Sequence, residues 1–382
     1  MSSPAPSPPK QNFGVRLERF WQRVTEGMEL NQIWSQFRSD TRASYRFYSK
    51  EIDSTRTAGM TRGRRFLYIT EQFFWAILEK LSPARRILLL LALIFLILGG
   101  GEFTTPRSSG NIHIYWNTHF YGGVLMFLLL MLEIGDRVVM KRDLQIAKEI
   151  QQWLLPSIPP IVPGLEVAFI TRPANTVAGD FYDIFPRTGT DGTWLLAVAD
   201  VAGKSMPAAL LMASFQASLK TLSTTNVSLA ELALGMNRYA CTNSQQGRRF
   251  TTAFLGEYAP ATRTLTYINA GHNNPMLRRT GGQLERLDVG GVPLGVLEDA
   301  AFPSATVTLN PGDWLVIFTD GVIEAENDSA QEYGEDRLIT MVNYGLALTP
   351  AQMLHQIMAD VDRFVGTTPQ HDDITCMLIK AV

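Results

Sequence analysis

The segment Trp194-Leu195-Leu196-Ala197-Val198-Ala199-Asp200, followed by Val201-Ala202-Gly203-Lys204, carries the clearest structural signal in the chain. Its apolar residues form the short run that is typical of a buried strand, and the turn after it leads into a helical pattern over Met206–Leu222. Glycine in this turn permits a tight bend and a close approach of the backbone. The segment therefore predicts a strand, a turn and a helix, with Asp200 at the end of the strand.

Further aspartates stand in three short segments of the same half of the chain: Ala178-Gly179-Asp180, Phe318-Thr319-Asp320-Gly321 and His371-Asp372-Asp373-Ile374-Thr375. Strand ends are where a sheet can direct several carboxylates to one point, and a cluster of carboxylates is costly unless cations neutralise it. Ligation by oxygen alone favours hard divalent ions such as magnesium or manganese. The pattern therefore predicts a metal-dependent enzyme.

Residues 161–382 alternate strand-like and helical patterns. We expect strands at Glu166–Thr171, Trp194–Asp200, Thr252–Tyr258, Thr264–Asn269, Thr306–Leu309, Trp314–Thr319 and Ile374–Ile379. We expect helices at Met206–Leu222, Leu229–Cys241, Asp336–Tyr344 and Pro350–Val365. Because the strands gather in the middle, the pattern differs from a regular parallel α/β fold and predicts an α+β domain of two antiparallel sheets covered by helices.

The net charge of −2 hides an asymmetry between the two parts of the chain. Residues 1–149 hold 20 lysines and arginines against 13 acidic residues, whereas residues 150–382 hold 14 against 23. A basic part beside apolar runs suits an anionic membrane surface. The acidic part carries no basic stripe, so no nucleic-acid partner is expected. Cys241 and Cys376 lie far apart, outside any metal-like spacing, and are expected to be buried reduced thiols.

Two apolar runs, Ile87–Leu98 and Phe120–Leu132, lie between clusters of arginine and lysine. Positive charge outside both ends predicts a two-span transmembrane hairpin over 86–135 with both ends in the cytoplasm. Residues 1–85 would then be a partly disordered cytoplasmic region, and the protein a multi-pass protein of the cytoplasmic membrane. The alternative is a buried helical hairpin in a soluble domain.

A linker helix region is expected over 136–160, with the helix itself over Asp136–Leu155, ended by Pro156, Pro159 and Pro160. Val139, Ile146, Ile150 and Trp153 follow a 3–4–7 spacing and form one apolar face. Two interpretations remain open. The face packs on the chain's own domain, or it pairs two copies of the chain as a homodimer.

Six motifs in this order resemble the metal-dependent protein phosphatase superfamily, the protein phosphatase 2C type, in its bacterial branch of sporulation stage II E-like and sigma-factor-regulator serine phosphatases. They are Gly179–Asp183, Asp200–Lys204, Asn269–Asn273, Gly290–Gly295, Thr319–Val322 and Asp372–Thr375. The segment Ile146–Pro156 also resembles the helix that precedes that catalytic domain, so the resemblance covers 146–382. It implies an αββα sandwich over 161–382, two divalent cations, Mn²⁺ or Mg²⁺, and hydrolysis of phosphoserine or phosphothreonine on a protein.

The resemblance also implies a set of site residues. Asp200 would bridge both metals, the backbone carbonyl of Val201 would bind the second, and Asp180 would lie near it. Asp320 and Asp372 would hold the first metal. Asp180 and Asp200 are thereby the expected catalytic residues.

Four more residues are open to two interpretations each. Asp183 and Asp373 are either outer partners of the metal ligands or carboxylates of a turn or strand edge. His272 either contacts phosphate or makes a structural hydrogen bond. Lys204 either contacts phosphate or is solvated.

The leading functional hypothesis is a membrane-anchored serine/threonine phosphatase of bacterial signal transduction. By the resemblance alone, its substrate would be a phosphorylated anti-anti-sigma-like regulator. The alternative is a catalytically silent membrane scaffold that binds a phosphoprotein. The presence of all four expected carboxylates favours the enzyme.

Overall fold

The computed structural model describes residues 62–98, 101–105, 112–189, 192–243 and 249–382. The chain divides into two compact units, Met1–Gly135 and Asp136–Val382. Most of the predicted region 1–85 therefore lies outside the described residues.

The first unit is built from helices and one hairpin. Its elements are α4 (Arg62–Lys80), α5 (Pro83–Leu98), the antiparallel strands β1 (Gly101–Thr105) and β2 (Ile112–Trp116), and the first part of α6 (Thr118–Leu154). Helices α5 and α6 approach closely at Gly122, where a Cβ atom would lie 2.8 Å from the Cγ of Leu96. Arg85 and Glu133 form an ion pair across the two helices, at 3.3 Å. Within the described residues, no helix reaches the length and hydropathy expected of a membrane span.

Helix α6 joins two segments that the sequence analysis treated as separate. The second apolar run and the linker helix form one continuous helix of 37 residues. It ends at Leu154, one residue before the predicted end at Leu155, because Pro156 follows and cannot continue a helix. The predicted apolar face is exposed in the single chain, with Trp153 at 82% and Ile150 at 47%, so it does not pack on the chain's own domain. The proposed homodimer contact stays a prediction.

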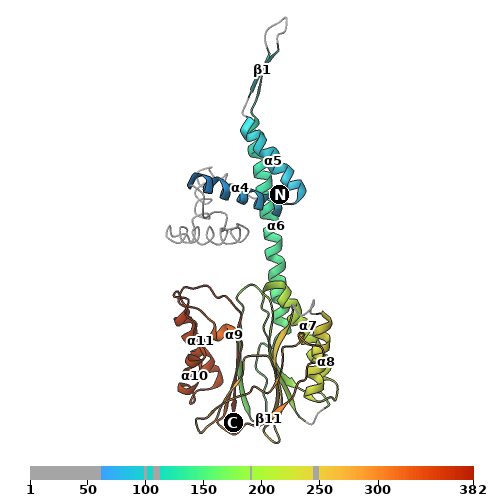
Figure 1. Cartoon of the computed structure of the whole chain (residues 1–382), viewed down its shortest axis with the longest axis vertical. Helices are drawn as coiled ribbons and strands as arrows, with labels where there is room; N and C mark the ends of the chain where they lie inside the picture. Colours follow the sequence, from blue (N-terminus) through green and yellow to red (C-terminus); the bar gives the residue numbers. More distant parts are fainter. Residues whose placement is uncertain (1–61, 99–100, 106–111, 190–191, 244–248) are drawn as a thin grey trace, which may run out of the picture. The chain divides into compact units, whose positions relative to one another are not determined.

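The second unit contains two β-sheets that face one another (Figure 1). One sheet has the strand order β10-β7-β6-β5-β4, with β11 also paired to β7, and the other has the order β3-β13-β12-β8-β9. All pairs are antiparallel except β10 with β7. The first sheet comprises β4 (Phe181–Pro186), β5 (Trp194–Val201), β6 (Thr251–Ala259), β7 (Thr264–Ala270), β10 (Gly290–Gly291) and β11 (Ala305–Thr308). The second comprises β3 (Leu165–Arg172), β8 (Met276–Arg278), β9 (Leu284–Arg286), β12 (Trp314–Phe318) and β13 (Ile374–Ala381).

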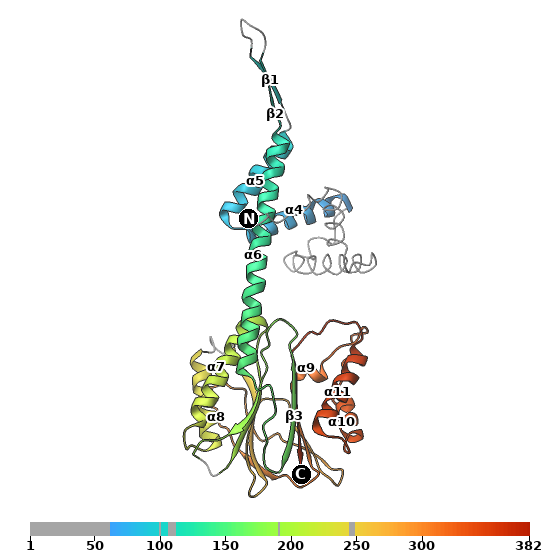
Figure 2. The ribbon, with the colours of Figure 1, turned by 180° about the vertical axis from the view of Figure 1, so that it is seen from behind.

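Helices cover the outer face of each sheet, as both ribbon views show (Figure 2). Helices α7 (Ser205–Ser223) and α8 (Leu229–Asn243) pack on the six-stranded sheet, and α10 (Glu335–Tyr344) and α11 (Pro350–Val365) pack on the five-stranded sheet. The short α9 (Asp320–Ile323) follows β12 directly. The predicted α+β sandwich of two sheets flanked by helices is thereby confirmed.

Alternation along each strand creates three apolar layers. Side chains such as Val198 and Phe254 point between the sheets, whereas their neighbours Ala197 and Leu255 face α7 and α8. The third layer, around Trp314, lies between the five-stranded sheet and α10 and α11. A strand buried on both faces is apolar throughout, which explains why β5 reads as one continuous apolar run.

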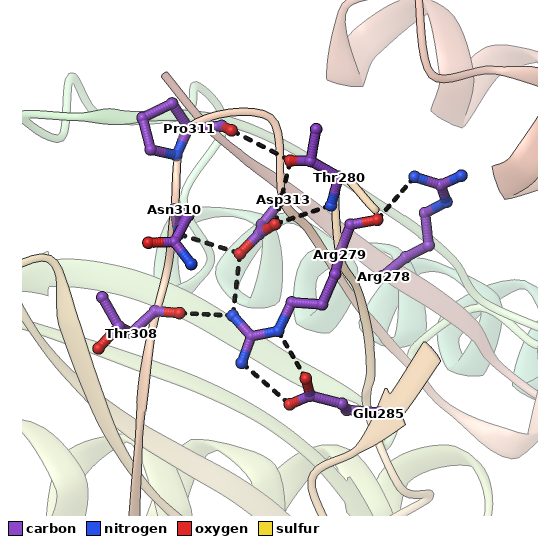
Figure 3. A network of polar contacts seen from close by, with 8 residues as sticks. All are labelled: Arg278, Arg279, Thr280, Glu285, Thr308, Asn310, Pro311 and Asp313. Atoms are coloured by element: carbon purple, nitrogen blue, oxygen red, sulfur yellow. Dashed lines mark hydrogen bonds and ion pairs between the residues drawn. The ribbon is translucent and has the colours of Figure 1, made fainter. Parts of the chain in front are cut away.

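A polar network closes one end of the sandwich (Figure 3). Arg279 makes two hydrogen bonds to Glu285, at 2.7 and 2.9 Å, one to Asp313 at 2.9 Å, and one to the carbonyl of Thr308 on the other sheet. Burial alone would raise the pKa of Asp313, but hydrogen bonds from Arg279 and from backbone amides lower it below its ordinary value. The turn before Asp313 needs glycine, because Gly312 has φ +87°. The network fastens the two sheets together at this end.

Candidate active site

The aspartates singled out in the sequence meet at the opposite end of the sandwich from the Arg279 network. Asp200 lies in β5, and Asp180 immediately precedes the neighbouring strand β4. Asp320 is the first residue of α9, directly after β12, and Asp372 and Asp373 precede β13, the strand beside it. Each sheet thus contributes aspartates from two adjacent strands.

Asp180 and Asp200 are the most strongly perturbed carboxyls of the group. Asp180 is 1% exposed. Burial, followed by repulsion from Asp200, raises its pKa well above its ordinary value. Burial also raises the pKa of Asp200 to about 7, with further contributions from Asp320, Asp372 and Asp373, while a hydrogen bond with Asp180 acts in the opposite direction. The two carboxyls therefore hold protons more tightly than free aspartates do.

The remaining carboxyls belong to the same electrostatic group. Burial, then the charge of Asp372, raises the pKa of Asp320. Burial also raises the pKa of Asp373, although the amides of Ala174 and Gly179 donate to its carboxylate at 2.7 and 2.6 Å. Asp373 therefore fixes the loop that leads to Asp180. This contact fits the expected outer partner of the metal ligands.

The group fits divalent cations by its donor chemistry and its charge. Every member offers carboxylate oxygen, the donor that magnesium and manganese prefer, and the raised pKa values show that the carboxylates repel one another. In the part of the chain that the structure describes, no three His, Cys, Asp or Glu side chains are already gathered closely enough to hold a metal ion.

Close backbone packing shapes this end of the sandwich. A Cβ atom on Gly321 would lie 2.0 Å from the carbonyl oxygen of Asp373. A Cβ atom on Gly179 would lie 3.1 Å from the carbonyl oxygen of Val201, the predicted backbone ligand. The glycine beside Asp320 is thus required by space, the one beside Asp180 is tightly packed, and the Val201 carbonyl lies beside the Asp180 segment.

Lys204 is the cation nearest to the carboxylates. Its ammonium group donates to Asp372 at 2.9 Å and to the carbonyl of His371 at 2.7 Å. Lys204 is therefore paired with a predicted metal ligand, and its contact with phosphate stays a prediction.

Asp183 lies away from the group. Its carboxylate forms an ion pair with Lys220 of α7 at 2.6 Å, and the Lys220 ammonium lies 3.3 Å from the centre of the Phe185 ring. Strand side chains alternate between faces, so an odd separation from Asp180 turns Asp183 toward the helix layer. The structure therefore favours the strand-carboxylate interpretation of Asp183.

His272 is buried and held by the protein itself. Its Nδ1 lies 3.1 Å from the hydroxyl of Thr252, and its backbone amide donates to Asn269 at 2.7 Å. Burial lowers the pKa of His272 to about 4, so the ring is neutral at pH 7. These contacts favour the structural hydrogen bond over a contact with phosphate.

Three features were missed in the sequence. A cavity of about 460 Å³ opens beside the carboxylates, with Lys204, Asp372 and Arg172 in its wall. Gln151 of α6 is 7% exposed and bonds both the amide and the carbonyl of Ala178, at 2.9 and 2.7 Å. The hydroxyl of Thr319 donates to the Asp180 carboxylate at 2.9 Å. Thr319 belongs to the motif Thr319–Val322, but its hydrogen bond with Asp180 depends on how the two sheets pack.

Comparison with known proteins gives consistent matches. The family model of Stage II sporulation protein E (SpoIIE) matches residues 190–382. Protein IcfG of Synechocystis is 24% identical over 311 residues, which cover 74% of this chain and 48% of IcfG, so the match spans about half of that relative. Phosphoserine phosphatase RsbU of Bacillus subtilis is 26% identical over 247 residues, 64% of this chain and 72% of RsbU. The SiaA-PP2C domain of Pseudomonas aeruginosa shares the fold, with a TM-score of 0.57 and 19% identity over 65% of this chain and 99% of that domain.

Proposed function

Because the chain belongs to the SpoIIE family, we propose that it is a metal-dependent serine/threonine protein phosphatase of bacterial signal transduction. One observation carries the proposal. Aspartates from four separate segments meet at one end of the sandwich and raise one another's pKa. A fold keeps such a repulsive group when a ligand compensates it, and perturbed carboxyls of this kind mark functional sites.

The residues that would hold two divalent cations are those named from the sequence. They are Asp180, Asp200, the carbonyl of Val201, Asp320 and Asp372. Bound there, manganese or magnesium would lower the pKa of water and offset charge on the phosphoryl oxygens. Asp373 keeps the Asp180 loop in place, and Lys204 brings positive charge to the side where a phosphate would enter.

The substrate that we propose is a phosphorylated protein, specifically a phosphorylated anti-anti-sigma-like regulator. Two observations support a protein substrate. The cavity beside Asp372 has the volume of a site that accepts a ligand or a few side chains, and RsbU, which aligns with 64% of this chain, is named a phosphoserine phosphatase.

We further propose that 86–135 anchors the protein in the cytoplasmic membrane, with 1–85 and the catalytic domain 161–382 in the cytoplasm and 136–160 as the linker. Large apolar side chains of α5 and α6 support this proposal. Ile97 is 82% exposed, and Ile87, Phe120 and Phe127 each exceed 60%. Surfaces of this kind are rarely left in contact with water.

Turnover with and without metal tests the proposed activity. The full chain in detergent should hydrolyse p-nitrophenyl phosphate and a serine-phosphorylated protein with manganese or magnesium, and should stop after chelation. Activity that survives thorough chelation would contradict the metal-dependent mechanism. Binding of the phosphoprotein without turnover under all metal conditions would instead support the silent scaffold.

A further inference from the structure

The hydroxyl of Thr319 lies at the junction of three of the aspartate segments. Thr319 is fully buried, between the end of β12 and Asp320. Its hydroxyl donates to Oδ2 of Asp180 at 2.9 Å and accepts from the backbone amide of Thr375 at 2.9 Å. Asp180 immediately precedes β4 of the six-stranded sheet, whereas Thr319 immediately follows β12, and Thr375 lies in β13, of the five-stranded sheet. One hydroxyl therefore joins the two sheets directly beneath the carboxylates.

We propose that Thr319 is a positioning residue that orients Asp180 for metal binding. The Thr319 hydroxyl occupies one oxygen of the carboxylate, while Asp180 also shares a hydrogen bond with Asp200. A buried carboxylate that is held at one oxygen presents the other in a fixed direction. Asp180 also has a side-chain hydrogen bond with Thr375 of β13. Without the Thr319 hydroxyl, Asp180 keeps that contact but loses the one that fixes Oδ2 beside Asp320.

The surrounding contacts prevent Thr319 itself from moving. Its backbone amide donates to the carbonyl of Thr375 at 3.0 Å, which continues the β12–β13 ladder beyond the strand end. The hydroxyl of Thr375 in turn lies 2.8 Å from that of Thr171 on β3. Thr319, Thr375 and Thr171 thus form a chain of hydrogen bonds that ends at the Asp180 carboxylate. Hydrogen-bond partners of metal ligands typically contribute about 10- to 100-fold to metal affinity or activity.

The inference rests on the proposed function, because it assumes that Asp180 binds metal. The test is Thr319→Val, which keeps the shape and removes the hydroxyl, compared with Thr319→Ser, which restores it. The matched control is Thr306→Val on β11, which removes an exposed hydroxyl that lies 3.1 Å from the hydroxyl of Thr266 on β7.

Metal binding is measured by calorimetry and by the metal-induced rise in Tm on the full chain in detergent, alongside the metal concentration for half-maximal turnover. Thr319→Val should weaken manganese binding about 10- to 100-fold. Thr319→Ser and Thr306→Val should stay within about threefold of the wild type, as expected where the hydrogen bond is kept or is remote from the site. If Thr319→Val does not fold, Thr319→Cys, a weak donor of similar size, takes its place with an intermediate loss expected.

Wild-type metal affinity in Thr319→Val or Thr319→Cys would overturn the inference. An equal loss in Thr319→Ser would also overturn it, because packing of the methyl group would then be responsible. A wild-type chain that binds neither manganese nor magnesium would instead overturn the proposed function, so the two failures are distinguishable.

Discussion

Replacing Asp200 by asparagine should stabilise the metal-free protein while it removes the response to metal. In the folded chain, burial and neighbouring carboxylates raise the pKa of Asp200 from 3.8 to about 7. The folded state therefore binds more protons than the unfolded state between about pH 4 and pH 7, and stability falls as the pH rises through that window. At pH 8 the cost of keeping this carboxylate ionised is about 4 kcal/mol, from about 1.4 kcal/mol for each pKa unit.

The expected gain in Asp200→Asn is smaller than that figure. The amide keeps the size of the carboxyl but loses its charge, and water penetration lowers the cost in real proteins. We expect about 2 kcal/mol of added stability at pH 8 with chelator present, and a smaller difference at pH 5. The measurement is urea denaturation of the chelated protein at both pH values, repeated with saturating manganese.

Asp183→Asn is the matched control, since it makes the same change at the aspartate that pairs with Lys220. This variant should lose about 1 kcal/mol, because Lys220 is partly exposed, and should keep the stabilisation by manganese. The reasoning would be refuted if chelated Asp200→Asn were no more stable than the wild type at pH 8. A manganese response equal to that of the wild type would refute the assignment of Asp200 as a metal ligand.

Three further predictions concern parts of the chain outside the carboxylate group. Ile146→Lys with Ile150→Lys should change turnover without changing metal affinity, and should weaken any dimer in sedimentation measurements; wild-type values for both would make the helix a passive tether. A cysteine at Ser108 should react with an impermeant reagent in intact spheroplasts, whereas one at Ser157 should react only after lysis; the reverse pattern would rule out the proposed hairpin. Gly312→Ala should lower the free energy of unfolding by about 1–2 kcal/mol in urea denaturation, because Gly312 has φ +87°, and should leave turnover unchanged at saturating metal. An unchanged urea midpoint would show that alanine is not strained at this position.

The main strands and helices could be predicted from the sequence because their patterns are long and regular. Pro350–Val365 appears with the predicted bounds, since Thr349 and Gln352 form a capping box at its start. Strands β8, β9 and β10 have only two or three residues, too few for a period to be recognised. The two compact units meet at Gly135 and Asp136, where the sequence analysis placed a boundary, but helix α6 runs through this point without a break.

The candidate site was predictable only as a list of residues. The motifs located Asp180, Asp200, Asp320 and Asp372, but not which neighbours hold them. Partners such as Thr319 come from the opposite sheet, so their contacts depend on how the sheets pack and leave no local signal. The period of two along β4 was available and would have separated Asp183 from Asp180.

The position of β13 also determines when the carboxylate group can assemble. This strand is made after all the other described strands, yet it lies between β3 and β12 and is preceded directly by Asp372 and Asp373. Until it is in place, β3 lacks the one strand that pairs with it among the described residues, and the carboxylate group is incomplete. Pairings of such long sequence separation form late in folding. We therefore expect the carboxylate group to assemble only once β13 has inserted between β3 and β12.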